Sequence, residues 1–380
     1  MKTAKYLYRN GAIDKSLNDL EINHTKCQLV LGFGEKKILS DNIAYDCFRK
    51  KFPNADIALC SGAGEIYGDE VLDESLSVIA IEFEKTKIIS NSIKINSFET
   101  SYEAGAALVK NIDKNNLKYI FVLSDGSKVN GSELVSGIES VIQHTIPVTG
   151  GLAGDGINFN TTTLGLNGDL QSGNIIAIGF YGDAIKVNHS SMGGWEIFGL
   201  EKKITKSRSN ELFEIDNESA LELYKKYLGK YADELPGSAL LFPLSIVLPG
   251  YDEPIVRTIL SVNNEHNSMT FAGDVPEGSK VRFMRANFDK IVDAAGEAAQ
   301  NTLPKLNTTP PQLAILISCV GRKIILGKRV DEEVLAVRDV FGKNTMLSGF
   351  YSYGEISPFN SSTKCELHNQ TMTITTFDEL

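Results

Sequence analysis

The sequence predicts an α/β fold made of repeated βαβ units, with mixed, largely parallel sheets, following β-hairpins and two related domains. Three observations predict it. A strand–helix–strand pattern is written three times, a glycine followed by an acid closes each copy, and an alternating apolar run comes after each closing pair. Internal repetition in a constant order indicates repeated structural units. The length of 380 residues allows two domains.

Each copy opens with a short apolar run bounded by glycine, which is typical of a strand buried on both faces. These runs cover residues 28–34, 119–126 and 313–321. A segment with apolar residues at helical spacing follows, and it predicts a helix that covers a sheet face. The three helical segments are residues 40–51, 132–143 and 331–341. A second apolar run returns the chain, so we expect the two strands of each unit to be parallel.

The second strand of each copy runs into a Gly-rich turn. The closing pairs are Gly64-Glu65, Gly154-Asp155 and Gly354-Glu355. Loops at the carboxyl ends of parallel strands line ligand crevices, and glycine lets a ligand approach the backbone. The turns therefore predict a ligand site. The alternative for any one of them is a tight turn whose carboxylate caps nearby backbone N–H groups.

Residues 196–281 depart from the repeat. Residues 220–228 have the pattern of an amphipathic helix that ends at Gly229. Residues 239–244 predict the start of an edge strand, because proline occupies position 243. Residues 286–303 predict a long helix. These features indicate a leader segment over residues 1–26, an N-terminal domain with two repeats over 27–222, and a C-terminal domain over 223–380.

Composition excludes several classes of protein. A net charge of -10 disfavours a surface for nucleic acid or anionic membranes. No apolar run reaches the length of a membrane-spanning helix. The five cysteines are scattered and form no CxxC pair, which favours buried thiols in a reducing cytoplasm over disulfides or zinc. Neither metal-ligand spacing nor a P-loop is present, so we expect no metal and no cofactor.

In order and content these segments resemble the FIST family, which joins a FIST N-terminal domain to a FIST C-terminal domain. The resemblance extends over residues 27–378. Its motifs lie at residues 60–66, 123–126, 150–156, 189–195, 272–278, 281–286, 318–322, 349–356 and 368–371. Two departures occur: Leu59 stands where the family often has glycine, and residues 190–193 separate His189 from Gly194-Trp195.

The resemblance implies a cytoplasmic sensory protein of signal transduction that binds a small polar metabolite and catalyses nothing. Amino acids are the ligands proposed for relatives. Relatives are also often fused to histidine kinases or cyclic-di-GMP enzymes, so we expect the output partner here to be a separate signalling protein of that kind.

The candidate ligand-binding residues come from the Gly-rich turns, from two arginines suited to a ligand carboxylate, from one tryptophan, and from a polar run before the last strand. They are Ser61, Gly62, Gly64, Glu65, Gly150, Gly151, Gly154, Asp155, Trp195, Arg285, Ser318, Arg322, Tyr351, Gly354, Glu355, His368, Asn369 and Gln370. For the arginines the alternative is an ion pair, for the polar run a strand-end network without ligand, and for Trp195 a core aromatic.

Two other functions remain open at this stage. The first is an enzyme with a Cys or Ser nucleophile in the same cleft, using Cys60 or Cys319 with a histidine. Ser61 lacks the flanking glycines of a nucleophile elbow. The second is a protein-interaction scaffold, whose sign would be a large exposed apolar patch without an enclosed polar pocket.

Overall fold

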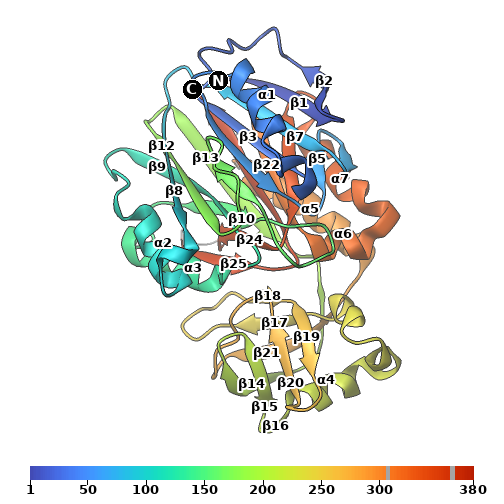
Figure 1. The fold of residues 1–380 in the computed structure, drawn as a ribbon. Helices are drawn as coiled ribbons and strands as arrows, with labels where there is room; N and C mark the ends of the chain where they lie inside the picture. Colours follow the sequence, from blue (N-terminus) through green and yellow to red (C-terminus); the bar gives the residue numbers. More distant parts are fainter. Residues whose placement is uncertain (305–308, 360–363) are drawn as a thin grey trace.

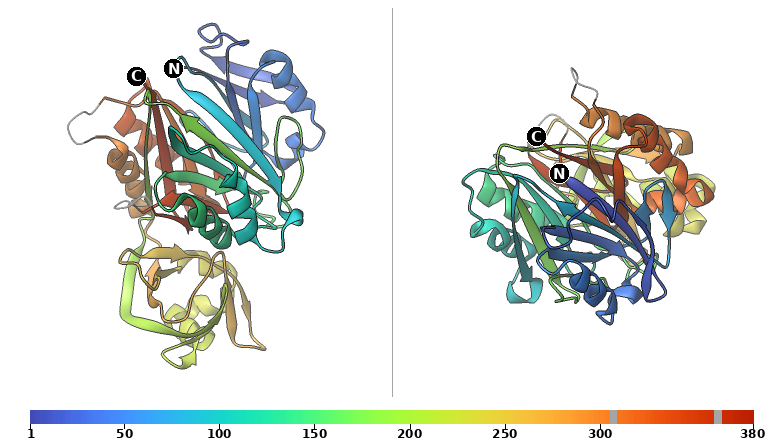
Figure 2. Two further views of the ribbon diagram at one scale, coloured as in Figure 1. Left: turned by 90° about the vertical axis from the view of Figure 1, so that its left-hand side faces the viewer. Right: turned by 90° about the horizontal axis from the view of Figure 1, so that it is seen from above.

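The computed structural model describes residues 1–304, 309–359 and 364–380. Three six-stranded sheets form the main body, and a fourth sheet is attached to one end of it (Figure 1). Each of the three sheets holds one repeat. Seen along the body, the first repeat (blue), the second (green) and the third (red) surround a common centre (Figure 2).

The first sheet has the strand order β11-β4-β3-β7-β1-β2. Its strands are β1 (Lys2–Arg9), β2 (Ala12–Leu17), β3 (Leu29–Gly34), β4 (Asp56–Ser61), β7 (Leu76–Glu82) and β11 (Leu164–Leu166). The second sheet has the order β25-β24-β10-β9-β12-β8. Its strands are β8 (Lys87–Lys94), β9 (Leu117–Ser124), β10 (Val148–Leu152), β12 (Asn174–Tyr181), β24 (Gly354–Pro358) and β25 (Cys365–His368).

The third sheet has the order β13-β26-β22-β23-β5-β6. Its strands are β5 (Glu65–Tyr67), β6 (Glu70–Leu72), β13 (Ile185–Met192), β22 (Leu313–Cys319), β23 (Met346–Ser352) and β26 (Met372–Glu379). The fourth sheet is antiparallel throughout its described pairs. Its strands are β14 (Glu196–Arg208), β15 (Glu211–Ile215), β16 (Glu218–Ser219), β17 (Leu244–Val247), β18 (Ile255–Arg257), β19 (Ile259–Asn263), β20 (Ser268–Phe271) and β21 (Lys280–Arg285).

The predicted βαβ units are confirmed, because β3 and β4, β9 and β10, and β22 and β23 are parallel neighbours. Parallel pairing is confined to these pairs among the described strands of the three sheets. The sheets are therefore mixed, but less parallel than expected. The alternating run after each turn forms β7, β12 or β26, and each of these strands lies antiparallel to the first strand of its own repeat.

Each sheet is completed by a strand from another repeat. The strand after the first Gly–acid turn, β5, pairs with β23 of the third sheet. The strand after the third turn, β24, pairs with β10 of the second sheet, and β11, after the second turn, pairs with β4 of the first sheet. This exchange is cyclic, so every repeat is bonded to both of the others.

Helices cover the outer faces of the three sheets, as the apolar stripes predict. α1 (Ile43–Lys51) lies on the first sheet, α2 (Ser101–Lys110) and α3 (Gly131–Ile142) on the second, and α5 (Phe288–Thr302) and α7 (Val330–Phe341) on the third. α6 (Val320–Leu326) follows β22, and α4 (Ala220–Leu228) packs on the fourth sheet. Short 3₁₀ helices are η1 (Lys36–Leu39), η2 (Ile95–Ser97), η3 (Gly229–Glu234), η4 (Gly237–Leu241) and η5 (Gly327–Arg329).

The predicted strand over residues 239–244 is wrong. Residues up to Leu241 belong to η4, and β17 begins only at Leu244. Pro243 has no N–H to donate, so the chain enters the sheet only after it. The predicted helix over 220–228 is confirmed as α4.

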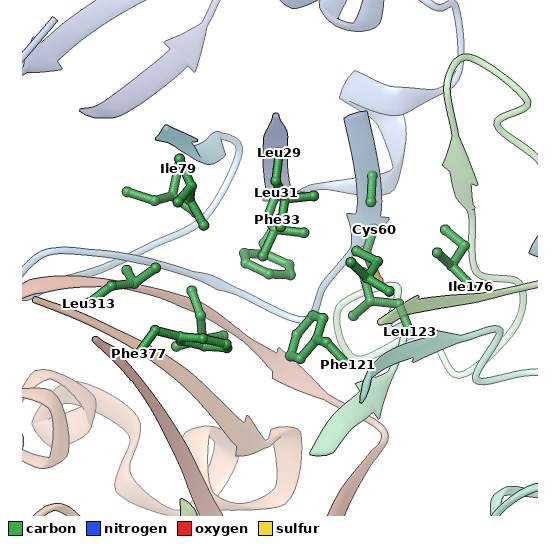
Figure 3. Close-up of a cluster of buried hydrophobic side chains, with 14 of the residues drawn as sticks. Leu29, Leu31, Phe33, Cys60, Ile79, Phe121, Leu123, Ile176, Leu313 and Phe377 are labelled. Carbon is green, nitrogen blue, oxygen red and sulfur yellow. The ribbon is translucent and has the colours of Figure 1, made fainter. Parts of the chain in front are cut away.

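The inner faces of the three sheets enclose one central core. Leu31 and Phe33 come from the first sheet, Phe121 from the second, and Leu313 and Phe377 from the third (Figure 3). Phe33 stacks on Phe350 of β23 with ring centroids 4.8 Å apart. The strands of all three repeats therefore share one hydrophobic interior. Within the described residues, every helix is too short or too polar to span a bilayer.

Candidate functional site

The three Gly–acid turns meet at one end of the three-sheet body. The N–H of Gly154 donates to the carbonyl of Ser61 (2.9 Å), which joins the second turn to the first. The N–H of Ala63 donates to the carbonyl of Tyr351 (2.8 Å), and the N–H of Tyr353 donates to the carbonyl of Leu152 (3.1 Å). Backbone hydrogen bonds thus link all three turns, and side chains far apart in sequence lie together.

A cavity of about 720 Å³ opens beside the first and second turns. That volume is in the range of small-molecule sites. Gly62, Gly64, Glu65 and Asp155 line it, and all four are among the residues predicted from sequence. The other lining residues are Glu35, Lys36, Lys37, Ser40, Ala63, Asp73, Glu74, Gly156, Asn158 and Asn160. We call this space the charged cavity, because carboxylates and ammonium groups face it together.

Glu65 is buried in the wall of the charged cavity. Its Oε2 accepts a hydrogen bond from the hydroxyl of Ser75 (3.0 Å). Burial raises the pKa of the Glu65 carboxyl well above its ordinary value, and the nearby carboxylates of Asp73 and Glu35 add to the rise. The raised pKa favours the neutral acid, which can donate a hydrogen bond to a ligand as well as accept one.

Asp155 belongs to the second turn and is bonded to Tyr353, which directly precedes the third turn. One of its oxygens accepts the hydroxyl proton of Tyr353, and the other accepts the N–H groups of Asn160 (3.2 Å) and Thr161 (3.0 Å). The Tyr353 hydroxyl accepts the N–H groups of Asp155 (3.1 Å) and Phe159 (3.0 Å) in return. This network fixes the loop from residue 155 to 161, which forms one wall of the charged cavity.

Lysines supply the positive side of the site. The Lys36 ammonium donates to the hydroxyl of Thr161. Lys323 of α6 donates to the carbonyl of Ala63 (2.8 Å) and pairs with Asp73. Gly64 has φ +141, and a Cβ at this position would lie 2.5 Å from the Lys323 ammonium. The backbone conformation therefore favours glycine here, and a larger residue would also displace the end of the Lys323 side chain.

The equivalent turn of the third repeat is filled by its own side chains. Glu355 is fully buried and accepts hydrogen bonds from Ser352 Oγ (2.6 Å), Thr371 Oγ1 (3.0 Å) and Thr371 N–H (3.2 Å). Burial raises its pKa to about 8, although these hydrogen bonds and the Arg322 charge oppose the rise. Glu355 therefore does not line the charged cavity.

Arg322 and Glu333 form a fully buried ion pair beside that turn, with an Arg322 NH2–Glu333 Oε2 distance of 2.8 Å. The guanidinium also donates to the carbonyls of Gly193 (2.7 Å) and Ile291 (2.7 Å). Glu333 accepts the hydroxyls of Ser318 (3.0 Å) and Tyr351 (2.6 Å). The predicted residues Ser318, Arg322 and Tyr351 thus belong to one buried network around Glu333.

Three more predicted residues occupy interior positions. Ser61 donates to the carbonyl of Gly154 (2.7 Å) and accepts the N–H of Thr163 (2.9 Å). Gly150 and Gly151 lie inside β10, and a Cβ at Gly150 would be 1.8 Å from the Val122 carbonyl of β9. These glycines therefore permit close strand packing.

The polar run before β26 is also buried. His368 is bonded to the carbonyl of Ser357 (3.0 Å), and burial lowers its pKa to about 4. The side chain of Asn369 donates to the His368 carbonyl (3.0 Å). Among the described residues, none hydrogen bonds to the side-chain amide of Gln370. The run lies at the third turn, apart from the residues that line the charged cavity.

Trp195 and Arg285 lie near the start of the fourth sheet. Trp195 is buried, packs with Met284 and Ile291, and donates from its indole N–H to the Gln370 carbonyl (2.9 Å). Arg285 is exposed and pairs with Glu196 at 3.0 Å. Neither is among the residues that line the charged cavity.

Comparison with family models decides the classification. The FIST N domain model matches residues 28–218, and the FIST C domain model matches residues 220–358. The chain belongs to the FIST family. FIST domains are sensory domains of signal transduction. The FIST N match covers the first two repeats, and the FIST C match covers much of the fourth sheet and most of the third repeat.

Two further proteins are similar to this FIST protein. The uncharacterized protein MJ1623 of Methanocaldococcus jannaschii is 21% identical over a 318-residue alignment that covers 77% of this chain and 60% of that protein. The chain thus spans less than two thirds of its relative's length. A crystal structure of a cyanuric acid hydrolase from A. caulinodans covers 100% of this chain and 99% of that one, with 7% identity and a TM-score of 0.37. So low a TM-score assigns neither fold nor activity.

Thiol and hydroxyl groups at the FIST turns are poorly placed for nucleophilic chemistry. Burial raises the pKa of the Cys60 and Cys319 thiols, so both stay protonated near neutral pH. The Ser61 hydroxyl is held by two backbone groups. Among the described residues, no group of His, Cys, Asp and Glu is arranged to hold a metal ion, and all five cysteines are free.

Sequence reasoning missed several residues of the site. Lys36, Lys37, Asn158 and Asn160 follow the ends of strands, where their polarity was the only available signal. Asp125, within the motif at residues 123–126, is a further buried carboxylate. Burial alone would raise its pKa, but hydrogen bonds from the N–H of Gly173, the hydroxyl of Thr162 and other donors hold it below the usual value.

Proposed function

We propose that this FIST protein is a cytoplasmic sensor that binds a small zwitterionic metabolite, such as an amino acid, in the charged cavity, and that it catalyses no reaction. One observation carries the proposal. The Gly–acid turns of two repeats converge on a cavity of about 720 Å³ whose walls hold carboxylates and ammonium groups. A zwitterion carries the two complementary charges, and such a cavity is large enough to enclose it.

The arrangement supports a division of roles. In the proposed complex, Lys36 and Lys37, which line the cavity, attract the ligand carboxylate, and Asp155 receives the ligand ammonium. Glu65, with its raised pKa, offers a hydrogen-bonding carboxyl group at the base of the Gly-rich turn. Free cysteines throughout the chain are consistent with a reducing compartment. We further propose that the bound state is passed to a signalling protein such as a histidine kinase or a cyclic-di-GMP enzyme.

A thermal-shift screen of the purified protein against amino acids, short peptides, nucleotides and organic acids tests the proposal. A ligand at 100 times its Kd adds about 2.7 kcal/mol to the free energy of unfolding, which raises the melting temperature measurably. We expect an amino acid or a similar zwitterion to raise it. The effect should be lost in Lys36→Ala and Asp155→Asn.

The matched control is Lys343→Ala. Lys343 is exposed and precedes the start of β23, whereas the third Gly–acid turn follows the end of that strand. This variant should keep the ligand-induced shift. A screen in which no zwitterion stabilises the protein, or a hit that Lys36→Ala and Asp155→Asn leave intact, would refute the proposed site.

A further inference from the structure

A second cavity, of about 440 Å³, lies where the second sheet meets the fourth sheet. Side chains from the body and from the attached sheet line it together. They include Asn130, Phe159, Asn210, Leu260, Phe271 and Tyr353. The loop from residue 155 to 161 separates it from the charged cavity, since Asp155 lines one space and Phe159 lines the other. We call this second space the aromatic cavity.

Two aromatic rings define one wall. Phe159 and Tyr353 stack with ring centroids 4.7 Å apart and an interplanar angle of 18°. The Tyr353 ring is held in place because its hydroxyl is bonded to Asp155. Phe159 nevertheless remains 49% exposed. The Phe159 ring thus forms part of the cavity wall and is not buried in a hydrophobic core.

The backbone at Phe159 is strained. Its φ is +50, a left-handed conformation that bulky side chains rarely adopt. Hydrogen bonds from Asn160 and Thr161 to Asp155, and from Phe159 N–H to Tyr353, hold the loop in this shape. Strain of this kind persists where surrounding contacts impose it, and it is concentrated at ligand sites.

The chemistry of the wall selects an uncharged ligand. Of the described residues that line the aromatic cavity, none has a charged side chain at neutral pH. Its amides are already engaged: Asn130 caps α3 and donates to Asp274 (3.2 Å), and Asn210 donates to the Phe271 carbonyl (2.8 Å). A ligand in the aromatic cavity would therefore interact mainly with the stacked rings, whereas a ligand in the charged cavity would meet carboxylates and ammonium groups.

We infer that the aromatic cavity is a second binding site, which takes an uncharged planar ring, such as a purine base or an indole, against the Phe159–Tyr353 stack. The aromatic cavity is a different space from the charged cavity, because Phe159 and Tyr353 line the first and Asp155 lines the second. Because residues of the body and of the fourth sheet both line it, a bound ring contacts both parts of the molecule.

Titration of the full-length protein with adenine and with indole, followed by saturation-transfer NMR, tests the inference. Neither probe carries a charge at neutral pH, so the experiment does not report on the charged cavity. We expect at least one probe to bind. Phe159→Ala should weaken binding about 5- to 150-fold, the range for loss of one stacking ring.

Phe288→Ala is the matched control, because Phe288 is an equally accessible phenylalanine (46% exposed) that does not line the cavity. Leu260→Ala, on the fourth sheet, provides a second variant in case Phe159→Ala alters the strained loop, and it should also weaken binding. Failure of both probes to bind, or equal binding by wild type and both cavity variants, would overturn the inference.

Discussion

Glu65 and Glu355 occupy equivalent turns of the first and third repeats, and both carboxyl groups are buried against a serine. Burial raises the pKa of each. Their surroundings differ in one respect: Glu65 borders the charged cavity, whereas Glu355 is enclosed by Ser352 and Thr371. The same residue pattern thus borders a cavity in one repeat and forms a buried hydrogen-bond network in another.

The raised pKa of Glu355 makes stability depend on pH. The carboxyl titrates near 4.5 in the unfolded chain and near 8 in the folded protein, so the folded state binds more protons between these values. The contribution of Glu355 to the free energy of unfolding is therefore largest below pH 4.5 and is lost as the pH rises toward 8. Glu355→Gln should be more stable than wild type at pH 8, by about 2–4 kcal/mol, and nearly equal near pH 4.5.

Urea unfolding of both proteins at pH 5 and pH 8 measures this difference. Glu297→Gln, at an exposed position on α5, serves as the control and should show no such change with pH. A difference between wild type and Glu355→Gln that is the same at both pH values would contradict the assigned ionisation.

At the scale of elements, α2 and α3 cross so closely that glycine is needed on both. A Cβ at Gly105 would lie 2.1 Å from the Leu134 carbonyl oxygen, and a Cβ at Gly137 would lie 2.0 Å from that of Tyr102. Helix propensity alone would favour alanine at both positions. Backbone contact between the helices outweighs that preference.

Gly105→Ala and Gly137→Ala should each lower the free energy of unfolding by about 1–3 kcal/mol, because the added methyl group forces the helices apart. Gly296→Ala in α5 is the control. Its nearest neighbour would be the Ala336 carbonyl oxygen at 3.6 Å, an ordinary contact, so it should stabilise by up to about 1 kcal/mol. Thermal unfolding of the three variants gives the comparison, and stabilisation by all three would disprove the close crossing.

The buried pair of Arg322 and Glu333 acts at the same scale. It joins α6 and α7 to the carbonyl of Gly193 after β13 and to that of Ile291 in α5. β13 and α5 flank the fourth sheet in the chain. The pair therefore anchors both chain connections between the body and the fourth sheet, one at Gly193 and one at Ile291. The spacing of residues in the sequence does not indicate this role.

At the scale of the molecule, the cyclic exchange of β5, β11 and β24 makes the three repeats interdependent. Central core residues such as Phe121 and Phe377 come from different repeats and pack in one cluster. Residues 28–218, which match the FIST N domain, contain the first two repeats together with β13 of the third sheet and β14 and β15 of the fourth sheet. The inner faces of these two repeats pack against the third repeat. The family's sequence boundaries and the packed units of the structure thus differ.

A fragment of residues 1–219 should consequently fail to unfold cooperatively, because it lacks β22, β23 and β26 and leaves the central core open. Circular dichroism during urea unfolding, with the full chain as reference, measures this. A fragment that unfolds in one sharp transition, like the full chain, would show that the third repeat is dispensable for the first two.

Repetition in the sequence predicted the parallel strand pairs and the covering helices, because each depends on local periodicity. The exchange of β5, β11 and β24 between repeats is determined by tertiary packing, so no local sequence pattern predicts it. For the same reason the sequence grouped Glu65, Asp155 and Glu355 as equivalents. Only the fold distinguishes the two that line the charged cavity from the one that is enclosed.

Arg322 and Ser318 illustrate the same limit. Residue type suggested contact with a ligand, whereas burial and the partner Glu333 depend on how α6 and α7 pack. Lys36 and Asn160 are ordinary polar residues in the sequence. Their position beside Asp155 follows from the convergence of two turns that are distant along the chain.

The most direct test of the proposed ligand site is hydrogen–deuterium exchange of the full-length protein with and without the zwitterion that the thermal screen identifies. We expect ligand-dependent protection of residues 35–40, 61–65 and 155–161, which carry most of the charged cavity's wall. Protection confined to other segments, or none at a saturating ligand concentration, would contradict it.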